Sequence, residues 1–484
     1  DMEGGKVYWS NWQGLSDVTS VMQTQRGMGA SKLSAPSVGG TINIVTRNID
    51  AKKGGMIMYS MGNNGYNKVA FSFSTGLMKN GWALTAMGSR TWGDGYVQGT
   101  SFQGYSYFVN ISKRINDNHQ LSLTGFGAPQ WHWTRPAGKY GALTLAEWNR
   151  VEQYMPQGMD KRQYNPSYGL GKDGKQQGTN YNQYHKPQIS LNHIWQIDET
   201  SSLSSVVYVS IGRGFGSTAE PGMDSPYSYS DLTNGANSGV VTNTFRDQTT
   251  GMFDYAMVEE LNAASDRGSL LAKFENRNDH NWVGVVSTYN KKLLNCLDLT
   301  VGVDARYYQG IHKAVLSDLM GGDYFIDSQQ RLKVSAENNP LRHDDEWVYA
   351  KLGKGGISYR DYTGTIVQEG AFASIEYSED NLSAFLNGSV YGQHNWRTDR
   401  YYYNNVTARD SVPRIGGTIK GGVNYKFAKY HNVFVNAGFI SRTPMYQAVY
   451  MSVATSNAIN NQAKNEKIAS VEVGYGFENQ YVSL

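Results

Sequence analysis

The stretch Gln25–Arg47 reads QRGMGASKLSAPSVGGTINIVTR and separates two parts of the chain that differ in their residue patterns. Its first half is rich in Gly, Ser and Ala, which predicts a compact, tightly turning backbone that passes close to other groups. Its second half, Thr41–Thr46, is rich in β-branched residues and predicts a strand. Val18–Gln25 is a second short strand candidate, so a small unit of two strands and a turn ends at Arg47. From Met56 onward, the sequence indicates one long series of strands.

The composition favours strands with one apolar and one polar but uncharged face. Hydrophobic residues make up 39% of the 484 residues and charged residues only 18%, whereas there are 54 Gly and 34 Tyr. The net charge of +3 gives no reason to expect a nucleic-acid partner. A single cysteine excludes an internal disulfide framework. The sequence contains no run of eighteen apolar residues, so no transmembrane helix is predicted. Strands of a membrane barrel would not produce such a run, because their apolar residues alternate with polar ones.

About fifteen segments after residue 55 read as strands, many joined by short Asn/Gly/Asp turns. Two long polar loops, Pro129–Pro187 and Gly214–His280, interrupt the series, and Leu261–Phe274 within the second is expected to form a short helix or another strand. Short turns that alternate with long loops are typical of outer-membrane barrels. The expected strands are Met56–Met61, Val69–Thr75, Trp82–Trp92, Tyr105–Ile115, Gln120–Phe126, Gln188–Ile197, Leu203–Ile211, Trp282–Tyr289, Leu294–Tyr308, Trp347–Leu352, Ala371–Tyr377, Leu382–Tyr391, Ile415–Phe427, Val433–Ile440 and Ala469–Gly476.

Alternation within single strands gives each segment two unlike faces. Val69, Phe71 and Phe73 fall on one face, and the residues between them are Ala and Ser. A sandwich would produce the same alternation, but several segments span about ten residues, the length that a tilted strand needs to cross a bilayer. The predicted fold class is therefore an all-β membrane protein, a large antiparallel transmembrane β-barrel.

The junction residues resemble the end of the plug domain of TonB-dependent outer-membrane transporters. The matching residues are Gln25-Arg26-Gly27 and then Gly39–Arg47, and Asn465–Tyr475 (NEKIASVEVGY) looks like the late barrel strand of the family. Tyr8–Trp12 with Asp17-Val18 is similar to plug segments of Bacteroides-type members. The resemblance implies an N-terminal α+β plug folded in the lumen of a barrel of about 22 strands, which is wide enough to require plugging. It divides the chain into the C-terminal part of a plug (1–50) and a barrel (51–484), with both chain ends expected to be truncated and the last barrel strands missing.

The resemblance also implies a function, namely active import of a scarce ligand across the bacterial outer membrane. The ligand is left open among siderophore complexes, cobalamin, haem, oligosaccharides and peptides, and no cofactor is implied. The implied partners are a TonB–ExbB–ExbD complex that supplies energy, the lipid of the outer membrane and a possible surface lipoprotein. The protein is expected not to be an enzyme. The alternatives are a passive ligand-specific porin, then an enzyme built in a barrel, and last a soluble all-β binding protein.

Three charged residues are candidates for gating between plug and barrel. Glu472 lies opposite two valines on its strand, so it is expected to face the lumen, because a charge on the lipid face is costly. Arg26 of the plug is a natural partner, and Glu376 is a second lumenal candidate. The resemblance implies that such ion pairs hold the plug until energy is supplied. The alternative reading is that these carboxylates only solvate the lumen.

Aromatic, amide and basic side chains make up a second group of candidates, for ligand binding. Stacking and hydrogen bonding by such groups suit a flat or sugar-like ligand. The alternative reading is interfacial anchoring or packing between loops, which is common for Trp in barrels. The plug candidates are Trp9, Asn11 and Trp12, and the loop candidates are Trp131, His132, Trp133 and Arg135.

Overall fold

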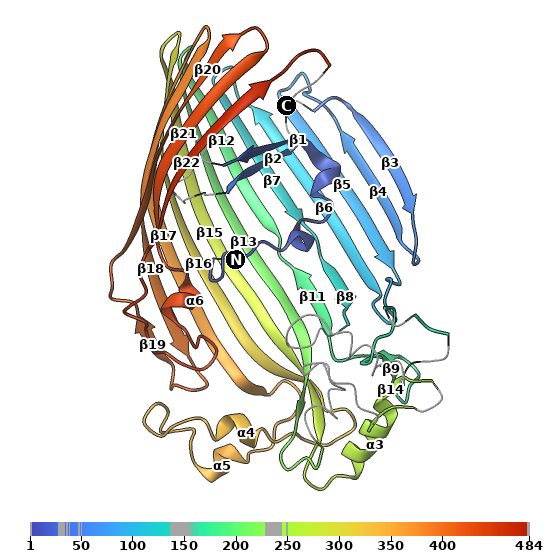
Figure 1. The fold of residues 1–484 in the computed structure, drawn as a ribbon. Helices are drawn as coiled ribbons and strands as arrows, with labels where there is room; N and C mark the ends of the chain where they lie inside the picture. The colour runs from blue at the N-terminus through green and yellow to red at the C-terminus, as the bar shows by residue number, and fades with distance from the viewer. Residues whose placement is uncertain are drawn as a thin grey trace.

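The computed structural model describes residues 2–27, 34, 37, 39–46, 49, 51–135, 155, 158–160, 162–227, 244–247 and 250–481. One large antiparallel sheet curls into a barrel, and a short N-terminal segment lies inside it (Figure 1). This inner segment comprises the described residues from Met2 to Thr46. It contains two 3₁₀ helices, η1 (Trp9–Trp12) and η2 (Leu15–Val18), and a hairpin of β1 (Thr19–Arg26) and β2 (Gly40–Thr46). The two strands expected around the Gly-rich turn are therefore confirmed.

The barrel strands follow the order of a closed barrel, and residue-by-residue pairing runs from β3 through to β22. Most strands pair with their neighbours along the chain, whereas β12 pairs with β7, and β8 and β11 pair with each other beside them. The strands are β3 (Gly54–Met61), β4 (Asn67–Ser74), β5 (Trp82–Gly93), β6 (Phe102–Arg114), β7 (His119–Gly127), β8 (Gln130–Trp133), β11 (Tyr181–His185), β12 (Gln188–Asp198), β13 (Ser201–Pro221), β15 (Leu271–Leu294), β16 (Leu297–Asp318), β17 (Ile357–Glu379), β18 (Leu382–Asp399), β19 (Val406–Arg409), β20 (Arg414–Ala428), β21 (His431–Arg442) and β22 (Glu466–Phe477).

The two ends of the barrel differ in their connections. At one end, which we call the short-turn end, brief turns such as 199–200, 295–296 and 380–381 join the strands. The other, long-loop end lies at the bottom of Figure 1 and carries long connections that fold into short elements. These elements are β9 (Gly169–Leu170), β10 (Gln176–Gln177), β14 (Phe253–Asp254), α3 (Tyr255–Ala264), α4 (Ser328–Arg331), α5 (Asp345–Val348) and α6 (Tyr446–Val449).

The outward faces of the strands form an apolar belt, as the alternation predicts. On β22, the side chains of Val471 and Val473 are 71% and 76% exposed, and on β4 Phe71 and Phe73 are exposed whereas Ser72 between them is buried. Such a belt is what a bilayer requires of a barrel surface. No helix in the described part of the chain is long and apolar enough to cross a membrane.

Several expected boundaries are wrong, mainly at the long-loop end. The predicted loop Gly214–His280 is partly strand, because β13 and β15 stay paired as far as Pro221 and Leu271. The predicted loop Pro129–Pro187 likewise contains β8 and β11. Strands that extend beyond the belt have no lipid-facing side, so their sequence loses the apolar alternation that marks a strand.

Three other expectations fail for local reasons. The segment Leu294–Tyr308 is not one strand, because a turn at 295–296 separates β15 from β16. Trp347–Leu352 is not a strand either. Helix α5 begins nearby, where the side chain of Asp344 accepts a hydrogen bond from the Trp347 amide at 2.8 Å and caps the first turn. Leu261–Phe274 holds the end of α3 and the start of β15 instead of a single element.

Candidate functional site

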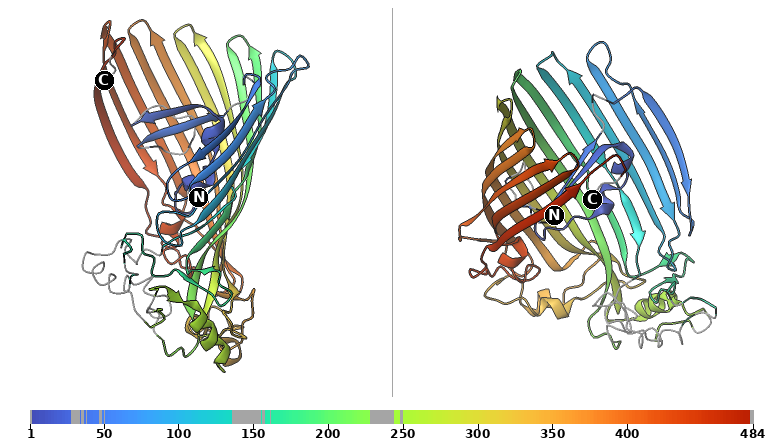
Figure 2. Two further views of the ribbon diagram at one scale, coloured as in Figure 1. Left: turned by 90° about the vertical axis from the view of Figure 1, so that its right-hand side faces the viewer. Right: turned by 45° about the horizontal axis from the view of Figure 1, so that its top comes forward.

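The inner segment lies on the concave side of the curled sheet in both views of Figure 2. Gly14 joins η1 and η2 with a left-handed backbone (φ +82°), and a Cβ at this position would lie 2.5 Å from the Ser106 side chain on β6. Next to it, Val18 is fully buried against Met87 and Phe108, which face inward from β5 and β6. Only glycine allows both the turn and this close approach to the wall.

Polar contacts fix the same part of the inner segment to the wall. The carboxylate of Asp17 forms a salt bridge with Lys68 of β4, with an Nζ–Oδ2 distance of 2.7 Å. The Ser106 hydroxyl donates to the Gln13 carbonyl at 2.7 Å. Side chains of the wall therefore satisfy both a charge and a main-chain group of the inner segment.

The Gly-rich turn of the inner segment contacts strands on another part of the barrel. The Ser34 amide donates to Oδ1 of Asp304 on β16 at 3.0 Å, and the Ser34 carbonyl accepts from the Ser389 hydroxyl on β18 at 3.0 Å. Lys420 of β20 donates to the Ser37 carbonyl at 2.7 Å. Since β4 is far from β16 in the strand order, the inner segment bridges the lumen.

Glu3 docks into a third site on the wall. Its Oε2 lies 2.8 Å from Nε2 of His312 on β16, and the glutamate is nearly buried. Gly310 and Gly364 leave the space for this carboxylate, since a Cβ at either position would lie within 2.7 Å of its oxygen. Sequence reasoning missed this contact, because no local pattern links residues 3 and 312.

The predicted gating residues are only partly described. The side chain of Arg26 lies outside the described residues, so its pairing with Glu472 stays a prediction. Glu472 lies on the inner face of β22, where a Cβ on Gly27 would be 2.1 Å from its Oε1. The Asn436 amide donates to its other oxygen at 3.5 Å. Glu376 is exposed near the short-turn end of β17 and pairs across the strands with Asp298.

Of the two predicted tryptophans of the inner segment, Trp12 contacts the wall. Trp12 packs against Phe126 of β7 with the rings tilted and their centres 5.3 Å apart, and Asn11 lines the same narrow gap. Trp9 is largely exposed. The interpretation of Trp12 as packing, instead of ligand stacking, therefore fits this contact best.

The predicted residues around β8 do not share one face. Directly opposed residues on paired strands lie on the same side of a sheet. His132 is opposed to Phe102 and Asn182 and faces the interior, whereas Trp131 and Trp133 face the outside of the barrel. Arg135 donates to the carbonyl oxygens of Arg162 and Tyr164 at 2.9 and 3.2 Å, so it holds the following loop. Both tryptophans thus lie on the opposite face of β8 from His132, because one step along a strand reverses the face.

His132 contributes to a cavity between the inner segment and the wall. The cavity has a volume of about 330 Å³. Its lining includes Ser10 and Gln13 from the inner segment and, from the wall, Phe102, Gln130, Trp131, His132 and Trp133. The buried Nε2 of Gln130 has no hydrogen-bond partner in the described structure. Aromatic, imidazole and amide groups that converge on a cavity of this size are typical of a small-molecule site. No group of three or more potential metal ligands occurs among the described residues.

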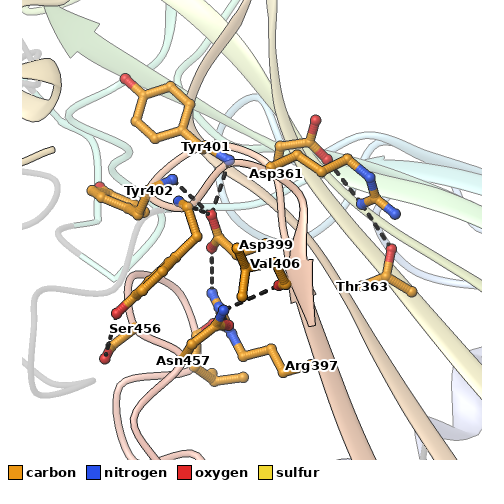
Figure 3. A network of polar contacts seen from close by, with 12 residues as sticks. Asp361, Thr363, Arg397, Asp399, Tyr401, Tyr402, Val406, Ser456 and Asn457 are labelled. Atoms are coloured by element: carbon orange, nitrogen blue, oxygen red, sulfur yellow. Dashed lines mark hydrogen bonds and ion pairs between the residues drawn. The ribbon is translucent and has the colours of Figure 1, made fainter. Parts of the chain in front are cut away.

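A buried ion pair stabilises the loops at the long-loop end (Figure 3). Arg397 and Asp399 at the end of β18 have no exposed side-chain surface and lie 2.7 Å apart. The other carboxylate oxygen of Asp399 accepts three backbone amides, from Tyr401, Tyr402 and Tyr403. Arg397 also donates to the Val453 carbonyl at 2.8 Å, so the pair joins two loops.

Comparison with known proteins supports the architecture. No protein-family model matches the chain, and no curated protein matches its sequence. Solved structures match its fold at 12% identity. The ferric citrate transporter FecA, unliganded, has a TM-score of 0.62 over 96% of this chain and 55% of FecA. The siderophore receptor PiuA from Acinetobacter baumannii has a TM-score of 0.61 over 95% of this chain and 60% of PiuA.

The ferripyoverdine receptor of the outer membrane of Pseudomonas aeruginosa, also 12% identical, matches over 96% of this chain and 51% of its own length, with a TM-score of 0.57. The chain therefore spans between half and two thirds of the length of these structures. It has the fold of TonB-dependent outer-membrane receptors. The Bacteroides-type subgroup stays a prediction.

Proposed function

We propose that the chain belongs to a TonB-dependent transporter that imports a scarce ligand across the bacterial outer membrane. The observation that carries this proposal is the inner segment, which bridges the lumen. Asp17 contacts β4, whereas Ser34 and Glu3 contact β16, far from β4 in the barrel. A passage blocked by a folded and bonded segment opens only when work is done on that segment. We place the boundary between plug and barrel at residue 50.

The energy for this work has to come from inside the cell, because the outer membrane has no ATP. A TonB–ExbB–ExbD complex that pulls on the plug is the partner that the proposal requires. Under this proposal, Arg26 pairs with Glu472 and adds to the resistance to pulling, because separating an ion pair in the lumen leaves an uncompensated charge. Glu376 is a weaker candidate for this role, since it is exposed and lies opposite the carboxylate of Asp298.

The ligand site of the proposal is the cavity between η1 and β8. The unpartnered Gln130 amide and the inward-facing His132 offer hydrogen bonds, and Phe102 offers an aromatic surface. Trp9 and Asn11 border this region on the inner segment, and Arg135 positions the loop above it. The ligand is a siderophore complex, cobalamin, haem, oligosaccharide or peptide. Ferric chelates come first for testing, because the structures similar in fold include a ferric citrate transporter and siderophore receptors.

Cells that express the protein provide the test, with and without a functional TonB. Accumulation of a radiolabelled ferric chelate should require TonB, whereas its binding to the cell surface should not. Uptake that persists without TonB would reject energised transport and favour a passive pore. Changing His132 to Ala should weaken surface binding, whereas changing Trp396 to Ala should leave it unaltered, because Trp396 lies outside the cavity.

A further inference from the structure

The outer surface of the barrel carries a groove at the long-loop end, lined by residues that include Trp131 of β8 and Gln183 of β11. Figure 1 shows where these two strands lie. This rim groove has a volume of about 390 Å³, and its lining includes Tyr105, Trp131, Phe215, Arg213, Arg277 and Asp279. The strand register shows which way these side chains point. Trp131 is opposed to Gln103 on one side and to Gln183 on the other, and Gln183 is opposed to Phe215. All of them share the outward face, because the alternate residue Ser106 contacts the inner segment.

The groove begins where the apolar belt ends. Along the outward face of β13, the exposed side chains Val207, Val209 and Ile211 are followed by Arg213 and Phe215. Along β6, the outward series runs from Ile111 and Val109 to Tyr107 and Tyr105. In a bilayer, the residues just beyond an apolar belt lie at the level of the lipid headgroups.

The charges around the groove are predominantly positive. Arg213 is exposed and uses one nitrogen for the Gly212 and His280 carbonyls at 2.8 and 3.2 Å, and it forms no salt bridge within the described structure. Arg90 on β5 is opposed to Tyr105, lies over its ring at 5.9 Å, and likewise forms no salt bridge there.

Two carboxylates lie nearby and limit this positive charge. Glu275 is paired with Arg277 at 2.8 Å, and Asp279 accepts the Gly214 amide at 3.0 Å. His185, opposed to Arg213, contacts the Tyr107 hydroxyl at 3.0 Å. With the Arg277–Glu275 pair neutral overall, Arg90 and Arg213 outweigh Asp279, so the groove favours an anion.

We propose that the rim groove binds the phosphorylated sugar headgroup of a glycolipid in the outer leaflet. Aromatic rings such as Trp131 and Phe215 provide flat apolar surfaces for the faces of sugar rings. The planar guanidinium of Arg213 matches the geometry of a phosphate. The acyl chains of the same lipid then lie along the apolar belt below. This inference rests on the proposed function only in that it places the long-loop end at the cell surface.

The test uses the purified protein in detergent and a bis-phosphorylated disaccharide lipid as the probe, with binding measured by native mass spectrometry and by titration. Arg213→Gln should weaken binding roughly tenfold, the loss of one charge-assisted hydrogen-bonding group. Trp131→Ala should weaken it as well, and Arg213→Lys should fall between Arg213→Gln and the unaltered protein. The matched control is Arg409→Gln, because Arg409 also lies near an outward tryptophan, Trp396, at 6.0 Å but outside the groove.

Each outcome decides the proposal once circular dichroism shows that the variants are folded. Equal binding by Arg213→Gln and Arg409→Gln would overturn it. Equal binding of the dephosphorylated lipid would also overturn it, as would competition by inorganic phosphate or a soluble sugar phosphate at the same concentration as the lipid. The assay needs no TonB, so lipid binding by a protein whose uptake proves TonB-independent would leave this inference standing and remove only the transport proposal.

Discussion

Asp17 of the inner segment and Lys68 of β4 lie 2.7 Å apart, and their side chains are only 12% and 15% exposed. Because little water reaches a pair that is enclosed to this extent, the charge that remains after one partner is removed is poorly solvated. Removing either charge is therefore costly. The pair lies beside the hydrophobic contact of Val18 with Met87 and Phe108. This part of the inner segment is therefore held to the wall by both charge and packing, and its release requires the loss of both.

The close approach at Gly14 predicts a strong effect of a single methyl group. Gly14→Ala should loosen η1 and η2 for two reasons. Alanine in the left-handed backbone of this position costs roughly 1–3 kcal/mol, and its methyl group overlaps with Ser106. Hydrogen exchange of residues 9–26 should become faster. Gly174→Ala is the control, since Gly174 also has a positive φ (+74°) but has open space around its Cβ position. Equal effects of both substitutions would show that contact with the wall is unimportant.

The buried pair at the end of β18 predicts a large effect on the loops. Arg397→Met should destabilise the long-loop end by about 3–5 kcal/mol, because Asp399 then remains buried without a cation. Denaturant unfolding measures this loss. Arg400→Met is the comparison, because Arg400 is partly exposed and lies 3.5 Å from its partner Asp361, so a much smaller loss is expected. Similar losses in the two variants would contradict the assignment.

The stability of the long-loop end should fall as the pH rises through neutrality. Glu220 lies at the far end of β13, beyond the apolar belt, where burial first and then repulsion from Asp327 raise its pKa to about 7. The folded form thus holds a proton that the unfolded chain releases near pH 4.5. The free energy of unfolding should accordingly decrease between about pH 4.5 and 7 and level off above that range.

Glu220→Gln removes this titration and serves as its control. The variant should be more stable than the unaltered protein at pH 8 and similar to it at pH 4, as measured by thermal unfolding at the two pH values. An unchanged pH dependence in the variant would assign the effect to another group, of which Asp327, whose pKa is also raised by burial, is the first candidate.

The apolar belt predicts opposite responses at neighbouring positions of β21. Val435→Arg places a charge on the outward face and should cost roughly 2–4 kcal/mol of folding into lipid bilayers if the position is near the midplane. Asn436→Arg places the same side chain on the inner face, next to Glu472, and should be tolerated. Folding yields in vesicles provide the measurement, and equal yields would mean that the belt does not face hydrocarbon.

The sequence allowed the barrel and its inner and outer faces to be predicted, because alternation is local. Val69, Phe71 and Phe73 face outward on β4 as expected, and so do Val471 and Val473 on β22. The resemblance at Gln25–Arg47 also placed the inner segment ahead of the strands. These features depend on residues one or two positions apart, which a sequence displays directly.

The contacts that build the candidate site could not be predicted in the same way. Glu3 meets His312 and Arg397 meets Asn457 only because the barrel brings distant segments together. The faces of Trp131 and His132 depend on the register of β8 against β6, which no turn of defined type fixes. The long extensions of β13 and β15 were not predicted, because the prediction relied on apolar alternation. Beyond the belt, the outward residues of these strands change from Val and Ile to Arg, Asn and Asp.

The most direct test of the account is to lock the inner segment to the wall. Asp17→Cys and Lys68→Cys, in a protein with Cys296→Ser, would be joined by a short bifunctional reagent that reducing agents cleave. The account predicts that the locked protein binds its ligand at the cell surface but imports none, and that cleavage restores import. Import by the fully locked protein at the unlocked rate would contradict the claim that this segment closes the barrel and has to move.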